Sequence, residues 1–520
     1  MSSPVPPSAR PSDADTSSTE VVGNDAAGLF ARGDEQPQPP LSTGATSTVD
    51  AAPKNGFDRF FEITRRGSTI AREIRGGVVT FVTMAYIVIL NPIILSSGAD
   101  IDGSQLDFLQ LSAVTGLTAA VMTILFGLVA RLPFGFAAGL GINAFLAFSV
   151  VGEVTWPEAM GLVVINGLII VLLSATGLRR MIFDAVPMQL KIAITVGIGL
   201  FIAFIGFVNA GFVTAAASPP VALGVGGSVA TVPTLLFVIT LLLTGVLVAR
   251  RVKGGILIGL VSGTVLAVLV EAIWHIGAKG DDNPGGWGLS VPALPSQLVS
   301  LPDLSLVGQF DLFGAFGRIG ALAALMLVFT LVFTNFFDAM GTMTGLAKEA
   351  EVADERGNFP RLKSALIVEG VGAVVGGATS SSSNTVFVES GAGISEGART
   401  GFANLVTGGL FLIAMFFTPL VSIVPTEVAA AALVIVGALM MSQIRFIDLT
   451  DFSALFGVFL TVSVMPMTYS IANGIGAGFV GWVAARAFSG KAKEISPLLW
   501  VVTAGFLIYF ARGPVEMLLS

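Results

Sequence analysis

The sequence predicts an all-α polytopic membrane protein in which about 14 segments cross the bilayer and the second half repeats the first with inverted topology. Three observations lead to this prediction. Apolar runs of about 17 to 22 residues, long enough to cross a bilayer as helices, recur along most of the 520 residues. Lys and Arg gather in every second loop, and two of the runs are interrupted by Gly and Ser.

The composition excludes several classes of function. The chain is 54% hydrophobic and 12% charged, with no cysteine and one histidine. Thiolate nucleophiles and zinc sites built from Cys or His are therefore excluded, and we expect no metal, no cofactor and no enzymatic activity. A formal net charge of -7, much of it in the tails and loops, gives no support for nucleic-acid binding.

The N-terminal segment differs from the rest of the chain. Residues 1–55 are rich in Pro, Ser, Thr and Asp and lack apolar clusters. Such a segment cannot bury enough apolar surface to offset the entropy cost of ordering, so we expect a disordered cytoplasmic tail. It has no basic region followed by an apolar region, so we expect no cleaved signal peptide, and the first span would direct insertion.

The candidate spans cover the rest of the chain as far as residue 487. In chain order they are 77–97, 109–130, 134–151, 157–175, 188–208, 232–249, 254–274, 318–344, 361–377, 384–400, 402–422, 427–441, 451–468 and 471–487. An amphiphilic piece at 497–511 is short for a crossing, so we expect an interfacial or re-entrant helix there.

The loop charges predict the orientation. Five arginines lie before the first span: Arg59, Arg65, Arg66, Arg72 and Arg75. Lys and Arg then follow the even-numbered spans: Arg131 after span two; Arg179, Arg180 and Lys191 after span four; Arg250, Arg251 and Lys253 after span six; and residues 348–363 after span eight. Because basic loops stay in the cytoplasm, this alternation predicts a multi-pass protein of the cell inner (plasma) membrane with both termini cytoplasmic.

Two short spans are interrupted: residues 131–148, RLPFGFAAGLGINAFLAF, and residues 381–400, SSSNTVFVESGAGISEGART. Each has the pattern of an extended piece followed by a Gly-rich helix start. Non-helical backbone at membrane depth must be satisfied by protein or by a water-filled cavity. The loop charges direct one span from the cytoplasm and the other from outside, so the two half-helices should approach each other at a central binding site.

Two acids lie within the predicted spans. Asp338 is deep in the apolar stretch VFTNFFDAMGTMTG, where an ionised carboxylate is costly unless it is solvated or paired. Glu389 lies where an extended piece becomes a helix, beside free N–H groups and the positive end of the helix dipole. Two carboxylates that share a cavity repel, so one binds a proton more readily, as proton coupling requires. The alternatives are that Asp338 bonds a neighbouring helix and that Glu389 only stabilises its own.

Other polar residues are weaker candidates. Asn143, in the first turn of the other half-helix, can contact a ligand or the freed backbone. Thr342 lies one turn after Asp338 and can bond a ligand or the carbonyls of its own helix. We expect the serines at 380–383 to bond the unwound backbone, and we expect His275, at an interfacial position, to have no role in the chemistry.

Five stretches make the chain recognisable: GVVTFVTMAYIVILNP, GLGINAFLAF, ITVGIGLFIAFIGFVNAG, FFDAMGTMTGLAKEA and GGATSSSSNTVFVESGAGISEGARTGFANLVTG. Through them the chain resembles, from about residue 57 to 490, the AzgA-like purine permeases of the nucleobase/ascorbate transporter (nucleobase:cation symporter-2) superfamily. The resemblance implies a 7+7 inverted repeat in which TM3 and TM10 are half strand and half helix. It also implies uptake of purine bases coupled to protons.

The resemblance further implies two domains. The core domain would comprise residues 56–180 (TM1–4) and 311–424 (TM8–11). The gate domain would comprise residues 181–310 (TM5–7 and an extracellular loop) and 425–490 (TM12–14). Residues 491–520 would form the C-terminal interfacial or re-entrant helix and the tail.

The resemblance also assigns site residues. Relatives that carry uracil or xanthine have an acid in helix eight and a polar group four positions later, which match Asp338 and Thr342. The helix-ten pattern N-T-x-x-x-E/Q matches Asn384, Thr385 and Glu389. The bacterial uracil relative has a histidine in place of Thr342, a departure that assigns proton coupling here to Asp338 or Glu389. The expected purine site comprises Asp338, Glu389, Asn143, Thr342, Val388, Ser390 and Ala138.

We therefore expect a secondary active transporter that imports hypoxanthine, guanine or adenine by proton symport, with alternating access between core and gate. Its partners would be the purine base, H⁺ and the lipid bilayer, and the sequence leaves a homodimer and Na⁺ coupling open. One alternative is an anion transporter of the sulfate-permease type, which has the same fold. The other is a permease of the uracil or xanthine type.

Overall fold

The computed structural model describes residues 55–177, 186–216, 220–224, 227–280, 282–288, 290–353, 359–448 and 450–519. The predicted tail, residues 1–55, lies outside the described residues except for Asn55, and so do Arg179 and Arg180. The Asn55 side chain accepts a hydrogen bond from the backbone N–H of Asp58 and so begins the first described helix.

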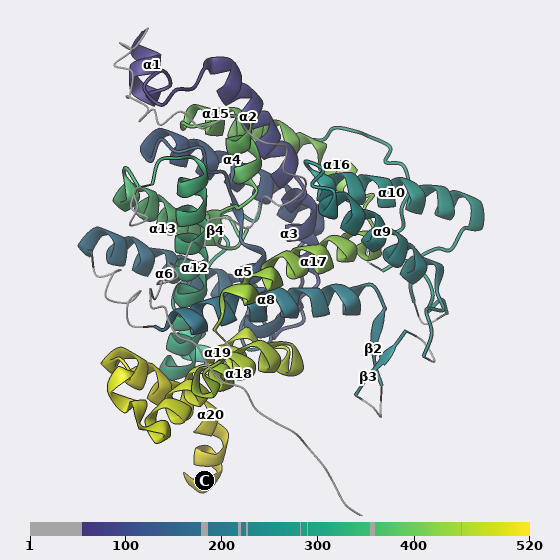
Figure 1. The fold of residues 1–520 in the computed structure, drawn as a ribbon. Coiled ribbons are helices and arrows are strands. Elements are labelled where there is room, and N and C mark those ends of the chain that lie inside the picture. Colours follow the sequence, from purple (N-terminus) through teal and green to yellow (C-terminus); the bar gives the residue numbers. More distant parts are fainter. Residues whose placement is uncertain are drawn as a thin grey trace, which may run out of the picture. The chain divides into compact units, whose positions relative to one another are not determined.

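The first half of the chain contains three short strands among long helices (Figure 1). In order, its elements are α1 (Gly56–Phe61), α2 (Ile70–Met84), α3 (Ile87–Ser96), α4 (Phe108–Val129), β1 (Phe136–Ala138), α5 (Leu140–Phe145), η1 (Leu146–Val150), α6 (Trp156–Thr176), α8 (Met188–Asn209), β2 (Val213–Ala215), β3 (Val221–Leu223), α9 (Val232–Ala249) and α10 (Gly255–Trp274). The strands β2 and β3 form a hairpin, whereas β1 pairs with a strand from the second half.

The second half repeats the alternation of long helices with one short strand-helix unit. In order, its elements are α11 (Gly314–Arg318), α12 (Ala321–Glu349), α13 (Leu362–Ala378), β4 (Asn384–Val386), α14 (Ser390–Ser395), α15 (Phe402–Ala414), η2 (Met415–Phe417), α16 (Thr418–Val421), α17 (Thr426–Met441), η3 (Ser442–Phe446), α18 (Phe452–Thr468), α19 (Ile471–Arg486), η4 (Ala487–Lys491), η5 (Ala492–Glu494) and α20 (Pro497–Leu519). Each half therefore contains one interrupted span, as the sequence predicted.

The predicted spans coincide with these elements. Within the described residues, nine helical segments of 18 or more residues are apolar enough to cross a membrane. The shorter helices α13, α18 and α19 occupy three further predicted spans, with 17, 17 and 16 residues. The last two predicted spans are the units β1–α5 and β4–α14. The polytopic helical fold with two half-strand, half-helix segments is confirmed, whereas the number of crossings stays a prediction.

The first span differs from its prediction. It begins at Ile70 rather than at residue 77, and it divides into α2 and α3 after Met84. Inside α3, Pro92 has no N–H to donate to the carbonyl oxygen of Val88 one turn earlier. The hydroxyl of Ser112 on α4 donates to that oxygen at 3.3 Å, so the freed group is satisfied inside the protein.

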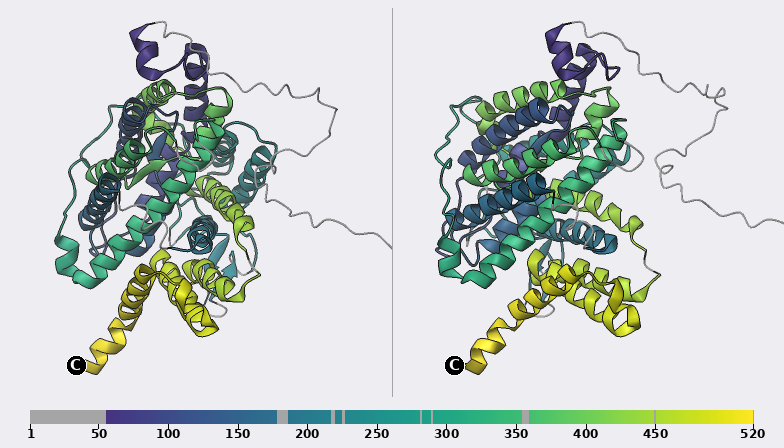
Figure 2. Two further views of the ribbon diagram at one scale, coloured as in Figure 1. Left: turned by 60° about the vertical axis from the view of Figure 1, so that its left-hand side comes forward. Right: turned by 90° about the vertical axis from the view of Figure 1, so that its left-hand side faces the viewer.

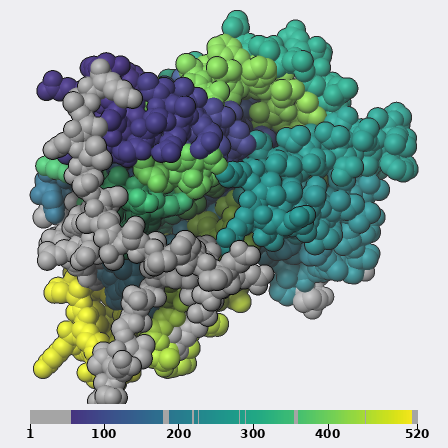
Figure 3. Space-filling view, turned by 45° about the horizontal axis from the view of Figure 1, so that its top comes forward, coloured from purple at the N-terminus to yellow at the C-terminus, as the bar shows by residue number. Residues whose placement is uncertain are grey.

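The helices pack in two groups. We call α2–α6 with α12–α15 the core group and α8–α10 with α17–α19 the gate group, because helices contact mainly members of their own group. In Figure 2 the purple, blue and green helices of the core group lie side by side. Figure 3 shows the teal surface of α9 and α10 beside the purple surface of α2, where α10 contacts α2.

Glycines let the core helices approach closely. A Cβ atom on Gly167 of α6 would lie 2.7 Å from the carbonyl oxygen of Gly370 on α13 and 2.5 Å from the backbone nitrogen of Val374. No larger residue fits at this crossing unless the backbones separate. The pair α6 and α13 therefore packs backbone to backbone.

The last helix is longer than the predicted piece at 497–511. It runs from Pro497 to Leu519 and packs against α19 and α12. A Cβ atom on Gly476 of α19 would lie 2.6 Å from the ring of Phe506, which places α20 directly on α19. Its interfacial or re-entrant placement stays a prediction.

Candidate functional site

The two interrupted spans meet in a short antiparallel sheet. In this sheet β1 pairs with β4, and Ala138 lies opposite Asn384. The backbone N–H of Gly139 extends the pairing by donating to the carbonyl of Ser383 at 2.9 Å. Because the strands are antiparallel and each leads into its own half-helix, α5 and α14 leave the sheet in opposite directions, as predicted.

The serine run before β4 braces this sheet. The hydroxyl of Ser380 donates to the carbonyl of Leu306 at 3.1 Å, and the hydroxyl of Ser383 accepts from the amide of Asn335 on α12 at 3.0 Å. Ser380 and Ser382 have positive φ values of 57° and 70°, which residues other than glycine rarely adopt. The surrounding contacts therefore hold a strained turn in place, in agreement with the predicted backbone role of the serines.

A cavity lies between the core group and the gate group, beside the start of α5. Its lining comes from both groups: Gly139, Gly141 and Ile142 at α5, Ile194, Thr195 and Ile198 on α8, Thr334, Phe337 and Asp338 on α12, and Met440 on α17. Most of this lining is apolar, and Asp338 supplies its carboxylate. A mainly apolar wall with a few polar groups is typical of small-molecule sites.

Glu389 directly precedes the other half-helix, α14. Its Oε1 atom accepts a hydrogen bond from the phenol of Tyr86, and its backbone carbonyl accepts one from the Thr83 hydroxyl at 3.3 Å. The carboxylate makes no capping hydrogen bond to its own helix. Its hydrogen bond therefore goes to another helix, while a purely electrostatic effect on α14 stays an alternative. Glu389 and Asp338 lie near enough to interact electrostatically, so two acids are brought together.

Two further predicted site residues are accessible. The side chain of Val388, next to Glu389, is 67% exposed although it lies at the start of a half-helix. Thr342 is partly exposed on α12, one turn after Asp338. Neither residue lines the cavity itself.

The remaining three predicted site residues are buried. Asn143 is fully buried in α5, and its amide atoms have no hydrogen-bond partner among the described residues. Ala138 is buried in β1. The hydroxyl of Ser390 accepts from the Gly135 N–H at 2.9 Å and donates to the Phe387 carbonyl at 2.6 Å. The structure thus gives Ser390 a bracing position between the two interrupted spans, away from the cavity lining.

The two sides of the cavity differ. Toward the C-terminal end of α12, a Cβ atom on Gly341 or Gly345 would have no neighbour within 4 Å in the described part of the chain. On the other side Tyr469, between α18 and α19, packs edge-on against Phe148 of the core group at 5.5 Å between ring centroids. It also packs against Phe201 of α8 at 5.4 Å. The core and gate groups therefore meet through aromatic rings at Tyr469, whereas α12 is exposed at Gly341 and Gly345.

The sequence did not indicate the gate side of the cavity. Ile194, Ile198 and Met440 are apolar residues in apolar helices, and no pattern separates them from residues that face lipid. Tyr86 did carry a signal. It is one of three tyrosines in the chain and lies in the middle of the predicted first span. In the structure its side chain is 1% exposed. A polar group at that depth needs a partner.

His275 lies outside the site. It ends α10 with a positive φ of 49°, and its side chain is exposed. We expect His275→Ala to transport substrate at the wild-type rate over the whole pH range, because the imidazole contacts neither acid. Uptake measured from pH 5 to pH 8 tests this. A pH profile that flattens in the variant would give the histidine a part in coupling.

Comparison with known proteins agrees with this architecture. Residues 71–476 match the Permease family. A guanine/hypoxanthine permease of Bacillus subtilis is 38% identical over 87% of this chain and 98% of its own length. An adenine permease of Escherichia coli is 32% identical over 89% of this chain and 97% of its own length.

Solved structures show the same fold at low identity. The transmembrane domain of a cyanobacterial bicarbonate transporter matches with a TM-score of 0.52 and 16% identity, over 80% of this chain and 96% of that domain. The murine anion transporter Solute Carrier 26 family member A9, in the inward-facing state, matches with a TM-score of 0.53 and 12% identity. The match covers 86% of this chain and 74% of that chain. With a family match over most of its length and relatives above 30% identity, the chain belongs to the Permease family and is a multi-pass membrane transporter, not an enzyme.

Proposed function

We propose that this permease imports purine nucleobases such as hypoxanthine, guanine or adenine. The observation that carries the proposal is the pair of acids: Asp338 lines the cavity between α5 and the gate group, and Glu389, at the start of α14, lies near enough to interact with it. Purine bases present ring N–H donors, and carboxylates accept them strongly in a site that excludes water. The names of the guanine/hypoxanthine and adenine permeases that resemble this chain support the same substrate class.

In the proposed complex the base lies in the cavity lined by Asp338 and extends toward Glu389. The end of β1 at Ala138 and the turn at Val388, between β4 and α14, would offer backbone groups to the ring. Asn143, whose amide lacks a partner among the described residues, would turn to the ligand when the cavity is occupied. Thr342 would border the path from the open surface. We leave Ser390 out of the proposed contacts because its hydroxyl already bonds two backbone groups.

We further propose that transport is proton symport. Two carboxylates that interact in a largely apolar site favour a state in which one of them is protonated. A proton bound there would leave with the base when the site opens to the cytoplasm. The same two side chains would then link substrate and proton, which is the requirement for coupled transport.

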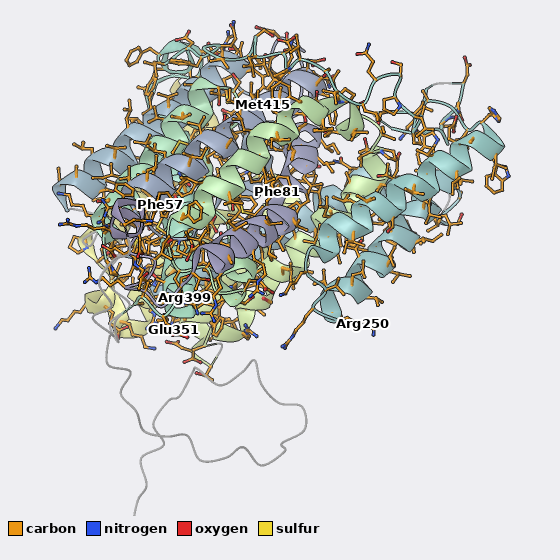
Figure 4. All side chains as sticks on the ribbon, turned by 90° about the horizontal axis from the view of Figure 1, so that it is seen from above. Phe57, Phe81, Arg250, Glu351, Arg399 and Met415 are labelled. Carbon is orange, nitrogen blue, oxygen red and sulfur yellow. The ribbon has the colours of Figure 1, made fainter. Side chains whose placement is uncertain are left out.

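Alternating access would arise from movement of the core domain (56–180 and 311–424) against the gate domain (181–310 and 425–490). The described conformation fits an inward-open state, in which Tyr469 closes the outer side and the surface at Gly341 and Gly345 is open. Figure 4 supports the orientation, because Arg250 and Glu351, in predicted cytoplasmic loops, and Arg399, at the predicted cytoplasmic end of the span 384–400, lie along one edge, whereas Met415 lies toward the opposite side. Both termini would then be cytoplasmic in the inner membrane.

Uptake by a transport-deficient host tests the proposed function. We expect cells that express this chain to accumulate at least one of radiolabelled hypoxanthine, guanine or adenine, and we expect a protonophore to abolish the accumulation. Radiolabelled uracil and xanthine test for a permease of the uracil or xanthine type, and radiolabelled sulfate tests for an anion transporter. Uptake of sulfate, uracil or xanthine without hypoxanthine, guanine or adenine would overturn the proposal, and uptake that survives the protonophore would overturn the coupling.

A further inference from the structure

A tyrosine of the first span contacts one of the two acids directly. Tyr86 lies between α2 and α3, and its phenol donates to Oε1 of Glu389. The tyrosine side chain is 1% exposed, so water does not compete for this donor. Because a hydrogen bond to an ionised acceptor is about twice as strong as a neutral one, this contact fixes the carboxylate firmly.

Close packing fixes the distance between the tyrosine and the acid. A Cβ atom on Gly393 of α14 would lie 2.4 Å from the carbonyl oxygen of Gly76 on α2, so the two helices touch backbone to backbone. Thr83, one turn before Tyr86, donates to the backbone carbonyl of Glu389 at 3.3 Å. The end of α2 therefore holds both the backbone and the side chain of the acid, and the carboxylate is preorganised before any ligand arrives.

The two halves of the repeat use this position differently. In the first half-helix the corresponding cap residue is Gly139, which lines the cavity together with Asp338 of α12. In the second half-helix the cap residue is Glu389, and Tyr86 of the first span bonds it. The first span is the counterpart of α12 in the predicted repeat. One half-helix start is thus open to a ligand, whereas the other carries an acid that the protein has already oriented.

We propose that Tyr86 is a positioning residue for substrate binding. Its hydroxyl holds Oε1 of Glu389 in place, so that Oε2 remains to accept a hydrogen bond from an N–H of the base. This inference rests on the proposed function and names the group that acts on one of its acids. The hydroxyl of Tyr86 does not touch the substrate in this arrangement. Its effect on affinity passes through Glu389.

The test is Tyr86→Phe, which removes the hydroxyl and keeps the ring. We expect KM for the purine that the wild type takes up to rise roughly ten-fold, with the maximal rate and the melting temperature nearly unchanged. The matched control is Thr407→Val. The Thr407 hydroxyl also bonds the backbone of α2, because it donates to the carbonyl oxygen of Gly77 at 2.9 Å, but it does not contact Glu389. We expect this control to keep the wild-type KM.

A double-mutant cycle separates positioning from a general packing effect. In a Glu389→Gln background the acceptor is neutral, so we expect Tyr86→Phe to raise KM less than it does in the wild type. Equal fold-changes in both backgrounds, or an unchanged KM in Tyr86→Phe, would overturn the inference while leaving the proposed function intact. If the wild type takes up no purine, the proposed function fails first, and the inference fails with it.

Discussion

Asp338→Asn is expected to reduce purine uptake by roughly 10- to 100-fold while the protein still reaches the membrane. The carboxylate is the acid of the cavity between the two groups, and it interacts with Glu389. Asparagine keeps the shape of the side chain but removes the negative charge and the proton site. Uptake and equilibrium binding of the radiolabelled base, measured on the same preparation, separate loss of binding from loss of coupling.

An acid outside the membrane provides the matched control for that experiment. Asp303 lies in the loop before α11, where hydrogen bonds from Ser305 and from Gln110 lower its pKa below the usual range. Asp303→Asn makes the same chemical change far from the cavity, and we expect unchanged uptake. If Asp338→Asn transports as well as Asp303→Asn does, Asp338 is not part of the substrate or proton site.

The sequence predicted the fold well because membrane segments follow simple physical rules. A helix needs a minimum length of apolar residues, and Gly and Ser at membrane depth mark backbone that is not helical. These rules placed the interrupted spans and their antiparallel approach, now seen as the pairing of Ala138 with Asn384. The same rules did not find the break after Met84, because an apolar run such as FVTMAYIVILNP gives no sign of where its hydrogen bonds change.

The chemistry of the residues decides how much of a candidate site can be predicted from the sequence. Asp338 and Glu389 could be found because charged groups in apolar spans are rare and costly. Ile198 and Met440 could not, because a membrane protein presents the same residue types to lipid, to its core and to a ligand. Ser390 was predicted as a ligand contact from its place beside Glu389, but a hydroxyl at the start of a half-helix also suits backbone bracing, and in the structure it bonds two backbone groups.

Gly376→Ala is expected to abolish transport and to destabilise the fold by roughly 3 kcal/mol. A Cβ atom on Gly376 of α13 would lie 1.9 Å from the backbone carbonyl oxygen of Ser382 and 2.8 Å from the side-chain nitrogen of Asn384. Ser382 already has a strained positive φ, so the turn has little freedom to move away. A shift of this turn would displace β4 and, through it, the start of α14 that carries Glu389. A thermal melt of purified protein and an uptake assay measure the two effects.

Gly409→Ala provides the comparison, because it adds the same methyl group to another core-group helix, α15, where a Cβ atom meets no described neighbour within 4 Å. Alanine is favoured over glycine inside a helix, so this variant should melt at the wild-type temperature or slightly above it and should transport normally. The contrast isolates the contact between α13 and the serine turn. If both variants melt and transport alike, the close approach of Gly376 to Ser382 does not support the half-helix, and the orientation of Glu389 must depend on α2 and Tyr86 alone.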